Sequence, residues 1–241
     1  MSIKLSNIDN MTFETTQKYD VIYCDYIYES LNFSWVLKFW PMLKDNGIFI
    51  AQCDWHSQHR FRIVMEDILH AEFVNHLVLK AEWGNHPKNK FHQCYDDIVI
   101  YSNNKKWFFD PSKIQVPKKT LTKGLNPSGR ETKQATAWID DITLTTTAKE
   151  RVRKDDGHLV RWQKPLKLFD RIIEPFINSA IIPSTIQILD PFAGVAPLGV
   201  WCKAKGYSYT GIELDEEVWN LAVGNIFPNN SDLVPEYKGD S

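Results

Sequence analysis

The chain has 241 residues, of which 43% are hydrophobic and 24% are charged, a composition that indicates a globular domain and excludes a largely disordered chain. Its net charge is only −2, it has no run of about 18 apolar residues, and its first residues lack a secretory signal, so we expect a cytoplasmic protein without a membrane partner. The four cysteines show no Cys-x-x-Cys spacing, which favours reduced thiols over disulfides or a zinc site.

The first hundred residues alternate between apolar runs and helical periodicity. Two short continuous apolar runs, at residues 21–24 and 48–51, are typical of strands buried inside a parallel sheet. Strands joined by helices predict an α/β fold with a mostly parallel, twisted sheet and helices on both faces. The elements predicted here are, in chain order, a strand at 21–24, a helix at 31–43, a turn at 44–47, a strand at 48–51, a helix at 61–69 and strands at 76–79 and 97–101.

Residues 103–156 break this pattern, because they are rich in Lys, Thr, Pro and Gly, and we interpret them as a mobile insertion with a binding role. Residues 103–161 contain 13 basic and 7 acidic residues, whereas the rest of the chain contains 15 and 23. A basic block in an acidic chain suggests a surface that faces a polyanion, although a solvated lysine-rich loop explains the same composition equally well. The best candidates for contacts with phosphates are Lys118, Lys119, Lys123, Arg130 and Lys133.

Regular structure is predicted again from residue 163 onward. A small-residue stretch at residues 190–197 interrupts the strand and helix patterns and indicates a turn. The elements predicted here are a helix at 166–177 with Pro165 in its first turn, a strand at 186–189, a helix at 198–205 closed by Gly206, a strand at 209–212 and a helix from Asp215 toward Ile226.

The segment between residues 186 and 213 predicts a nucleoside-binding site. A turn of small residues lets the backbone approach a ligand closely, and Glu213, at the tip of the next strand, can accept hydrogen bonds from both ribose hydroxyls. A dinucleotide site would need Gly-x-Gly-x-x-Gly to admit a pyrophosphate, but Gly194 and Gly199 are separated by Ala196. The pattern therefore favours a nucleoside cofactor without phosphates.

Residues 190–194 also carry a family resemblance. They read Asp-Pro-Phe-Ala-Gly and resemble the S-adenosylmethionine-binding motif of the amino-group DNA methyltransferases, Asp-Pro-Phe-x-Gly-Ser-Gly. Residues 163–166, Gln-Lys-Pro-Leu, are similar to the motif that precedes it in the family.

The first half of the chain resembles the catalytic half of the same family. Residues 25–28, Asp-Tyr-Ile-Tyr, end a predicted strand where the family has Asp-Pro-Pro-Tyr, and residues 43–47, with Cys53, Asp54 and His59, are similar to the stretch that follows. The catalytic loop comes first, then the insertion, then the cofactor motif, which is the circularly permuted order of the beta class. The resemblance implies a Rossmann-like methyltransferase fold, with a single domain over residues 1–241 and a target-recognition-like insertion over 103–156.

This resemblance implies transfer of a methyl group from S-adenosylmethionine to an exocyclic amino group of a base in DNA, as in restriction-modification systems. Asp25 and the backbone carbonyl of Tyr26 would accept the two N–H groups of the amine, and Tyr28 would stack on a base taken out of the helix. An Asp at the first loop position resembles the adenine-N6 members more than the Ser-bearing cytosine-N4 members, which favours adenine. The reaction needs no metal.

The implied cofactor contacts come from several parts of the chain. The methionine part would lie along residues 190–194, the ribose on Glu213 and the adenine near Asp9, with Lys164 close to the cofactor carboxylate. The full implied set is Asp9, Asn10, Asp25, Lys164, Asp190, Phe192, Gly194, Glu213 and Leu214.

The sequence departs from the family pattern in the catalytic loop, where Tyr26 and Ile27 replace both prolines. Prolines stiffen a loop, so their loss raises the entropy of ordering it. Two alternatives therefore stay open: a weakened or inactive methyltransferase-fold protein that binds nucleic acid, and a methyltransferase that acts on RNA. The recognised bases, a homodimer and an associated nuclease are also left open.

Overall fold

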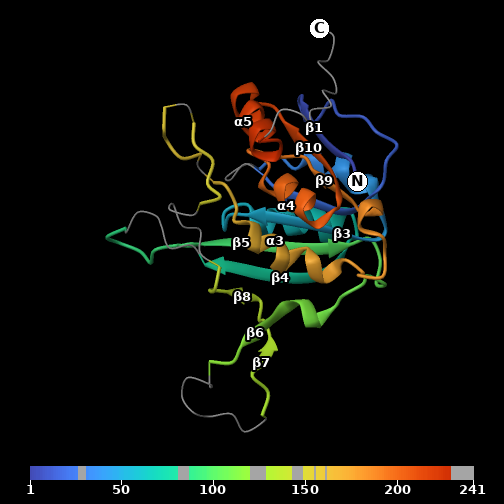
Figure 1. The fold of residues 1–241 in the computed structure, drawn as a ribbon. Coiled ribbons are helices and arrows are strands. Elements are labelled where there is room, and N and C mark those ends of the chain that lie inside the picture. Colours follow the sequence, from blue (N-terminus) through green and yellow to red (C-terminus); the bar gives the residue numbers. More distant parts are fainter. Residues whose placement is uncertain are drawn as a thin grey trace.

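A twisted eight-stranded sheet forms the centre of the protein, in the order β1-β10-β9-β2-β3-β5-β4-β8 (Figure 1). The structure is a computed structural model, which describes residues 1–26, 31–80, 87–119, 129–142, 149–154, 156–160 and 162–228. The strands of this sheet are β1 (Ile3–Asn7), β2 (Tyr19–Asp25), β3 (Leu43–Cys53), β4 (Glu72–Lys80), β5 (Tyr95–Ser102), β8 (Trp138–Ile139), β9 (Gln187–Asp190) and β10 (Ser208–Glu213).

Short helices connect many of these strands. A separate two-stranded hairpin, β6 (Gln115–Pro117) and β7 (Thr132–Gln134), belongs to the predicted insertion. The helical elements are α1 (Ser34–Phe39), η1 (Trp40–Met42), α2 (Gln58–Ile63), η2 (Val64–Ile68), η3 (Pro111–Ile114), α3 (Leu166–Ile172), η5 (Glu174–Phe176), η6 (Pro183–Thr185), α4 (Pro197–Lys205) and α5 (Glu216–Ile226). Helix α1 is followed directly by a 3-10 turn, η1, and α2 by a π-helical turn, η2.

The sheet is mostly parallel, as predicted. Strands β1, β10, β9, β2 and β3 run in one direction, and β5 runs against both β3 and β4. From β9 the chain continues through α4 to β10 on one side, whereas from β2 it continues through α1 to β3 on the other side. The carboxyl ends of β9 and β2 therefore form a topological switch point, where open α/β sheets bind their ligands.

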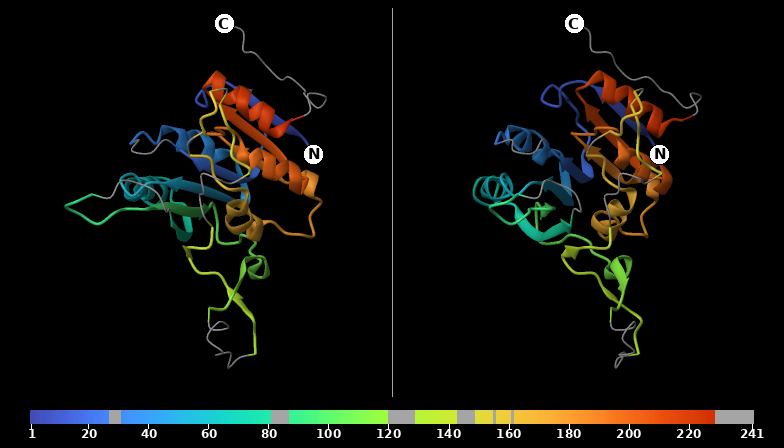
Figure 2. Two further views of the ribbon diagram at one scale, coloured as in Figure 1. Left: turned by 60° about the vertical axis from the view of Figure 1, so that its left-hand side comes forward. Right: turned by 90° about the vertical axis from the view of Figure 1, so that its left-hand side faces the viewer.

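Helices cover both faces of the sheet, which confirms the predicted α/β layering (Figure 2). Successive residues of a strand point to opposite faces, so Val21 and Tyr23 of β2 join the core beneath α3, α4 and α5, whereas Ile22 and Cys24 join the core beneath α1 and α2. Because both faces are buried, the central strands read as continuous apolar runs.

Prolines shorten two of the predicted helices. The helix expected at 31–43 is α-helical only over Ser34–Phe39, and Pro41 lies in the 3-10 turn that follows. The helix expected at 166–177 ends at Ile172, before the 3-10 turn that contains Pro175. Proline lacks the backbone donor that an α-helix interior needs and clashes with the preceding turn, so both corrections have the same cause.

The turn predicted at residues 44–47 lies within β3 instead. Asn46 takes a left-handed φ of +64°, which asparagine tolerates better than most residues. Its N–H donates to the side-chain oxygen of Asn103 at 3.1 Å, while the Asn103 amide donates to the carbonyl of Lys44 at 2.8 Å. A side chain from the far end of β5 therefore holds this irregular stretch in the sheet.

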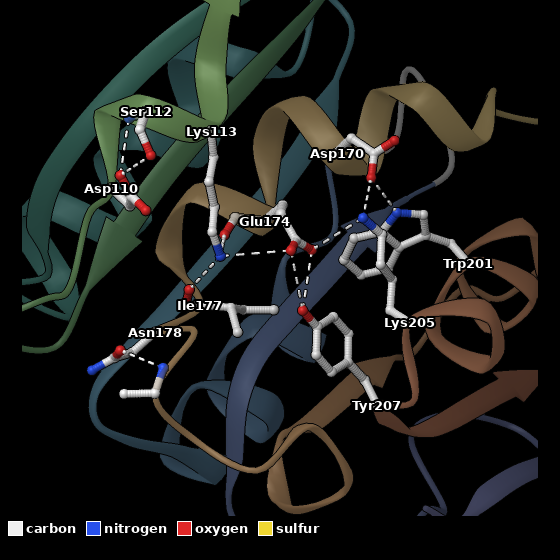
Figure 3. A network of polar contacts seen from close by, with 11 residues as sticks. Asp110, Ser112, Lys113, Asp170, Glu174, Ile177, Asn178, Trp201, Lys205 and Tyr207 are labelled. Carbon is white, nitrogen blue, oxygen red and sulfur yellow. Dashed lines mark hydrogen bonds and ion pairs between the residues drawn. The ribbon is translucent and has the colours of Figure 1, made fainter.

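Two of the attachments between the described part of the insertion and the core are a strand pairing and a lysine contact. Strand β8 pairs with β4 in parallel, and Ile139 and Ile142 are buried in the core. At the other attachment, the Lys113 ammonium donates to the carbonyls of Glu174 and Ile177 at 3.2 and 2.8 Å (Figure 3). Strand β8 was not identified from the sequence pattern.

The carboxylate of Glu174 links this attachment to the rest of the fold (Figure 3). It lies 3.5 Å from the Lys113 ammonium and accepts a hydrogen bond from the Tyr207 hydroxyl at 3.2 Å. Lys205 lies 3.7 Å from the same carboxylate and 2.8 Å from Asp170. The insertion, α3 and the start of β10 therefore share one polar network.

Among the helices of the described ranges, none has both the length and the apolar character needed to cross a membrane.

Candidate functional site

A pocket of about 1110 Å³ opens at the switch point between β9 and β2. Its walls come from the carboxyl ends of β2, β3, β9 and β10, from the loop after β1 and from the residues before α3. The predicted site residues that line it are Asp9, Asn10, Asp25, Tyr26, Lys164, Asp190, Phe192, Gly194, Glu213 and Leu214. The structure thus brings together all the described residues predicted for catalysis or cofactor binding, while Tyr28 lies outside the described residues.

Glu213 is held rigidly at the tip of β10. One of its carboxylate oxygens accepts the N–H of Gly194 at 2.9 Å, and the other accepts the N–H of Asp215 at 2.9 Å. Gly194 has a φ of +53°, a conformation that favours glycine, and this turns its N–H toward the carboxylate. A carboxylate has about four acceptor positions, so Glu213 can still accept hydrogen bonds from a ligand's hydroxyls.

Asp190 is buried at the end of β9, with only 2% of its surface exposed. Its carboxylate accepts the N–H of Phe192 and the hydroxyl of Tyr209, both at 3.3 Å. Burial raises the pKa of Asp190 to about 8, because the charged form loses its hydration. This carboxyl group is therefore poised to ionise when a cation enters the pocket.

Lys164 is buried beside Asp25, with 3% of its surface exposed. Its ammonium lies 3.4 Å from a carboxylate oxygen of Asp25 and 3.1 Å from one of Asp96. Burial alone would lower the pKa of Lys164, but the two carboxylates outweigh it and raise the pKa. Lys164 lines the pocket, and carboxylates of the protein itself engage its ammonium.

The ring of Tyr26 points away from the ligand space and into the core. It packs against Phe33, Trp35 and Phe61, and its hydroxyl donates to Ser57 at 2.9 Å. Side-chain packing therefore fixes the backbone at Tyr26, where the amino-group DNA methyltransferases have a proline. This anchoring offsets part of the entropy expected from the loss of the two prolines.

The pocket is strongly acidic. Among the described residues that line it, six carry carboxyl groups and Lys164 is the only Lys or Arg. The carboxyl groups belong to Asp9, Asp25, Asp54, Asp190, Glu213 and Asp215, and that of Asp190 holds a proton at neutral pH. Such a lining favours a ligand that carries positive charge. Within the described part of the chain, no three His, Cys, Asp or Glu side chains are arranged to hold a metal ion.

Sequence reasoning missed several residues of the pocket wall. Asp54, Trp55 and His56 follow β3, and the rule that parallel strands meet at one carboxyl edge, applied to the strand at 48–51, would have found them. Trp162 also lines the pocket, with a left-handed φ of +66° that is rare for a bulky residue. A backbone angle of this kind leaves no signal in one sequence.

The basic side chains predicted to contact phosphates lie elsewhere. Lys118 follows β6, while Arg130 and Lys133 lie before and within β7, on a hairpin that projects from the end of the sheet next to β8 (Figure 1). Lys119, beside Lys118, is ion-paired with Asp140 at 3.0 Å. The fifth residue, Lys123, lies outside the described residues.

Comparisons with known proteins agree with this geometry. A family model described as DNA methylase, for N6 and N4 methyltransferases, matches residues 14–224. The fold is similar to that of M1.HpyAVI in its complex with SAM, with a TM-score of 0.60, 20% identity, and coverage of 91% of this chain and 98% of that chain. It is also similar to the PvuII DNA methyltransferase, described as cytosine-N4-specific, with a TM-score of 0.68, 12% identity, and coverage of 95% and 88%.

A third similar structure is TTHA0409, a putative DNA modification methylase from Thermus thermophilus complexed with S-adenosyl-L-methionine. Its TM-score is 0.58, with 13% identity and coverage of 97% of this chain and 96% of that chain. No curated protein matches the chain. At these identities the three structures support the Rossmann-like methyltransferase fold alone.

Proposed function

The chain belongs to the N6/N4 DNA methylase family, and on that premise we propose that it transfers a methyl group from S-adenosylmethionine to the exocyclic amine of a base in DNA, with adenine N6 as the favoured acceptor. One observation carries the proposal: Asp25 lines the same switch-point pocket as Gly194 and Glu213. Methyl transfer requires that Asp25, which would bind the amine, lies close to the residues that would bind the cofactor.

The pocket fits the cofactor in shape and charge. Its volume of about 1110 Å³ exceeds the need of a single nucleoside with an amino acid side chain and leaves space for a base. Glu213 would accept the ribose hydroxyls, while the acidic wall around Asp190 would attract the positively charged groups of the cofactor. When bound, S-adenosylmethionine supplies an electrophilic methyl group on a positively charged sulfur.

The remaining chemistry is positioning of the amine. The lone pair of a base amine is delocalised into the ring, so the site must hold both N–H groups to direct that lone pair at the methyl group. Asp25 would accept one N–H and then take the proton that the methylated amine releases, and the Tyr26 carbonyl would accept the other. Tyr28 would stack on the base after it leaves the duplex.

The preference for adenine rests on Asp25, because an Asp at this loop position resembles the adenine-N6 members of the family. The phosphate contacts proposed for the β6–β7 hairpin would bind DNA without reading its sequence. The side chains expected to make these contacts are Lys118, Lys119, Arg130 and Lys133, together with Lys123, which lies outside the described residues.

The test is transfer of radiolabelled methyl groups to unmethylated DNA of mixed sequence, followed by separation of the nucleosides. We expect N6-methyladenine as the labelled product. Asp25→Ala should lose at least about 100-fold in transfer rate, because an acceptor in the transition state is worth that much. The matched control is Asp67→Ala, an exposed carboxylate on η2 outside the pocket wall, which should transfer at the wild-type rate.

Labelled N4-methylcytosine would support the proposed methyl transfer to DNA but contradict the preference for adenine. Binding of the cofactor without transfer to DNA would contradict the proposal, and transfer to RNA alone would replace the substrate.

A further inference from the structure

A chain of buried polar groups stands behind Asp25. The Tyr23 hydroxyl donates to the Gln52 side-chain oxygen at 2.8 Å, and the Gln52 amide donates to a carboxylate oxygen of Asp96 at 2.7 Å. The same oxygen of Asp96 lies 3.1 Å from the Lys164 ammonium, which in turn lies 3.4 Å from Asp25. Gln52 is fully buried and Asp96 is 6% exposed, so these contacts are shielded from water.

The two carboxylates contact Lys164 unequally. The Asp96 oxygen is nearer to the ammonium, at 3.1 Å, than the Asp25 oxygen, at 3.4 Å. Asp96 comes from β5 and is not part of the pocket wall, whereas Lys164 and Asp25 both are. Asp96 can therefore act on a ligand through Lys164, which contacts it and lines the pocket.

The charges of these three groups add up to one net negative charge. An ammonium that faced Asp25 alone would neutralise it and occupy the oxygens that the amine of the base requires. With Asp96 as a second partner, Lys164 is already balanced, and Asp25 keeps its charge toward the pocket. The Asp25 side chain is 18% exposed, so water screens this charge less than it would in bulk solvent.

We propose that Asp96 is a positioning residue that holds and neutralises Lys164, so that Asp25 presents one net negative charge to the positively charged sulfur of the donor. The proposal rests on the function proposed above. It implies that the site distinguishes the charged donor from its neutral product, S-adenosylhomocysteine, because transfer of the methyl group removes the charge that Asp25 attracts. S-adenosylhomocysteine lacks the positive charge on sulfur, so its attraction to Asp25 is lost and it should dissociate more easily.

The test compares the dissociation constants of S-adenosylmethionine and S-adenosylhomocysteine, measured by calorimetry without DNA. Asp96→Asn keeps the shape and removes one charge, so Lys164 should then neutralise Asp25. We expect affinity for S-adenosylmethionine to fall about tenfold and affinity for S-adenosylhomocysteine to change by less than about twofold. A parallel loss for both ligands would overturn the proposal, because a purely structural role predicts that result.

A double variant, Asp96→Asn with Lys164→Gln, restores the net charge of −1 and should restore the wild-type ratio of the two dissociation constants. A structural role predicts instead parallel losses for both ligands in both variants, with an unchanged ratio in each. If Asp96→Asn does not fold, the double variant, which removes the lysine together with its partner's charge, still tests the proposal: an altered ratio contradicts it.

Asp97→Asn is the matched control. Asp97 is the next residue of β5, it is 6% exposed, and its carboxylate pairs with His76 at 2.6 Å instead of Lys164. The same loss of charge there should leave the ratio unchanged. Failure of the wild-type protein to bind S-adenosylmethionine would contradict the proposed function, whereas wild-type binding with an unchanged ratio in Asp96→Asn would contradict only the role of Asp96.

Discussion

Asp25 and Asp190 end two neighbouring strands, yet their carboxyl groups have different partners. Asp25 lies beside the Lys164 ammonium, whereas Asp190 has the hydroxyl of Tyr209 and the N–H of Phe192 as its partners. Burial raises the pKa of Asp190 to about 8, so at neutral pH this group holds a proton until a cation approaches.

Cofactor binding should therefore release a proton from Asp190. Between about pH 6 and pH 8, affinity for S-adenosylmethionine should rise with pH, by at most about tenfold per unit, and level off above the folded pKa. Calorimetry in buffers of different ionisation enthalpy measures the released proton, and Asp190→Asn should abolish its release. Affinity that is independent of pH in the wild-type protein would contradict this assignment.

The same ionisation should destabilise the ligand-free protein as the pH rises. Unfolded Asp190 ionises near its ordinary pKa of 3.8, whereas the folded protein holds the proton up to about 8. Between these values the unfolded chain binds fewer protons at this site, so this contribution to the free energy of unfolding falls with increasing pH. Asp190→Asn should flatten the dependence, which urea unfolding at a series of pH values measures.

Under the proposed function Tyr26 acts through its backbone carbonyl, so its side chain should matter for stability alone. Tyr26→Phe keeps the ring packing and loses the hydrogen bond to Ser57, at a cost of about 1 kcal/mol in the free energy of unfolding. Tyr26→Ala should cost about 3–5 kcal/mol, as for other large buried rings. Urea unfolding and methyl-transfer rates separate the two effects: a stable Tyr26→Phe protein without transfer would show that the hydroxyl takes part in the chemistry.

At the scale of elements, the strands were the most predictable part of the fold. Those at 21–24 and 48–51 are buried on both faces and therefore show as continuous apolar runs. Strand β1 was missed because it is a short edge strand whose only buried side chain is Leu5. The two residues of β8 carry no strand signal of their own, since their pairing with β4 is decided by contacts distant in sequence.

Lys113 should fix the start of the insertion to the core. Lys113→Ala removes an ammonium that donates to two carbonyls and pairs with Glu174, which should cost about 1.5–3 kcal/mol. Hydrogen exchange should accelerate in η3 and β6, while cofactor affinity stays unchanged. Lys106→Ala, an exposed lysine of the same segment, is the control. Equal exchange in both variants would show that this attachment is dispensable.

For the whole molecule, one rule allowed the sequence to predict which residues line a common pocket: parallel strands of an α/β sheet meet their ligand at the carboxyl edge. That rule places Asp25, Asp190 and Glu213 together. The rule does not predict Asp96, because β5 is antiparallel to its neighbours and Asp96 lies near its amino end. Neither the reversed strand nor the burial of Lys164 between two carboxylates leaves a trace in local sequence patterns.

Opposite charges occupy different parts of the molecule, with carboxylates in the pocket and lysines on the β6–β7 hairpin. Replacing Lys118, Arg130 and Lys133 by alanine should weaken DNA binding and reduce the slope of log affinity against log salt by up to about 0.9 for each phosphate that is no longer neutralised. Lys119→Ala should have a smaller effect, because Asp140 already pairs with that ammonium. DNA titrations at several salt concentrations measure this, and an unchanged slope in the triple variant would mean that the hairpin is only a solvated surface.

The permuted order of the chain has a consequence for synthesis on the ribosome. In the sheet, β1 pairs with β10, and β2 pairs with β9. Each of these partners lies more than 150 residues further along the chain and is synthesised later. Until those partners emerge, the nascent chain presents unpaired strand edges that can join those of another copy. The arrangement that assembles the pocket from segments far apart in the sequence therefore delays native folding until β9 and β10 have emerged.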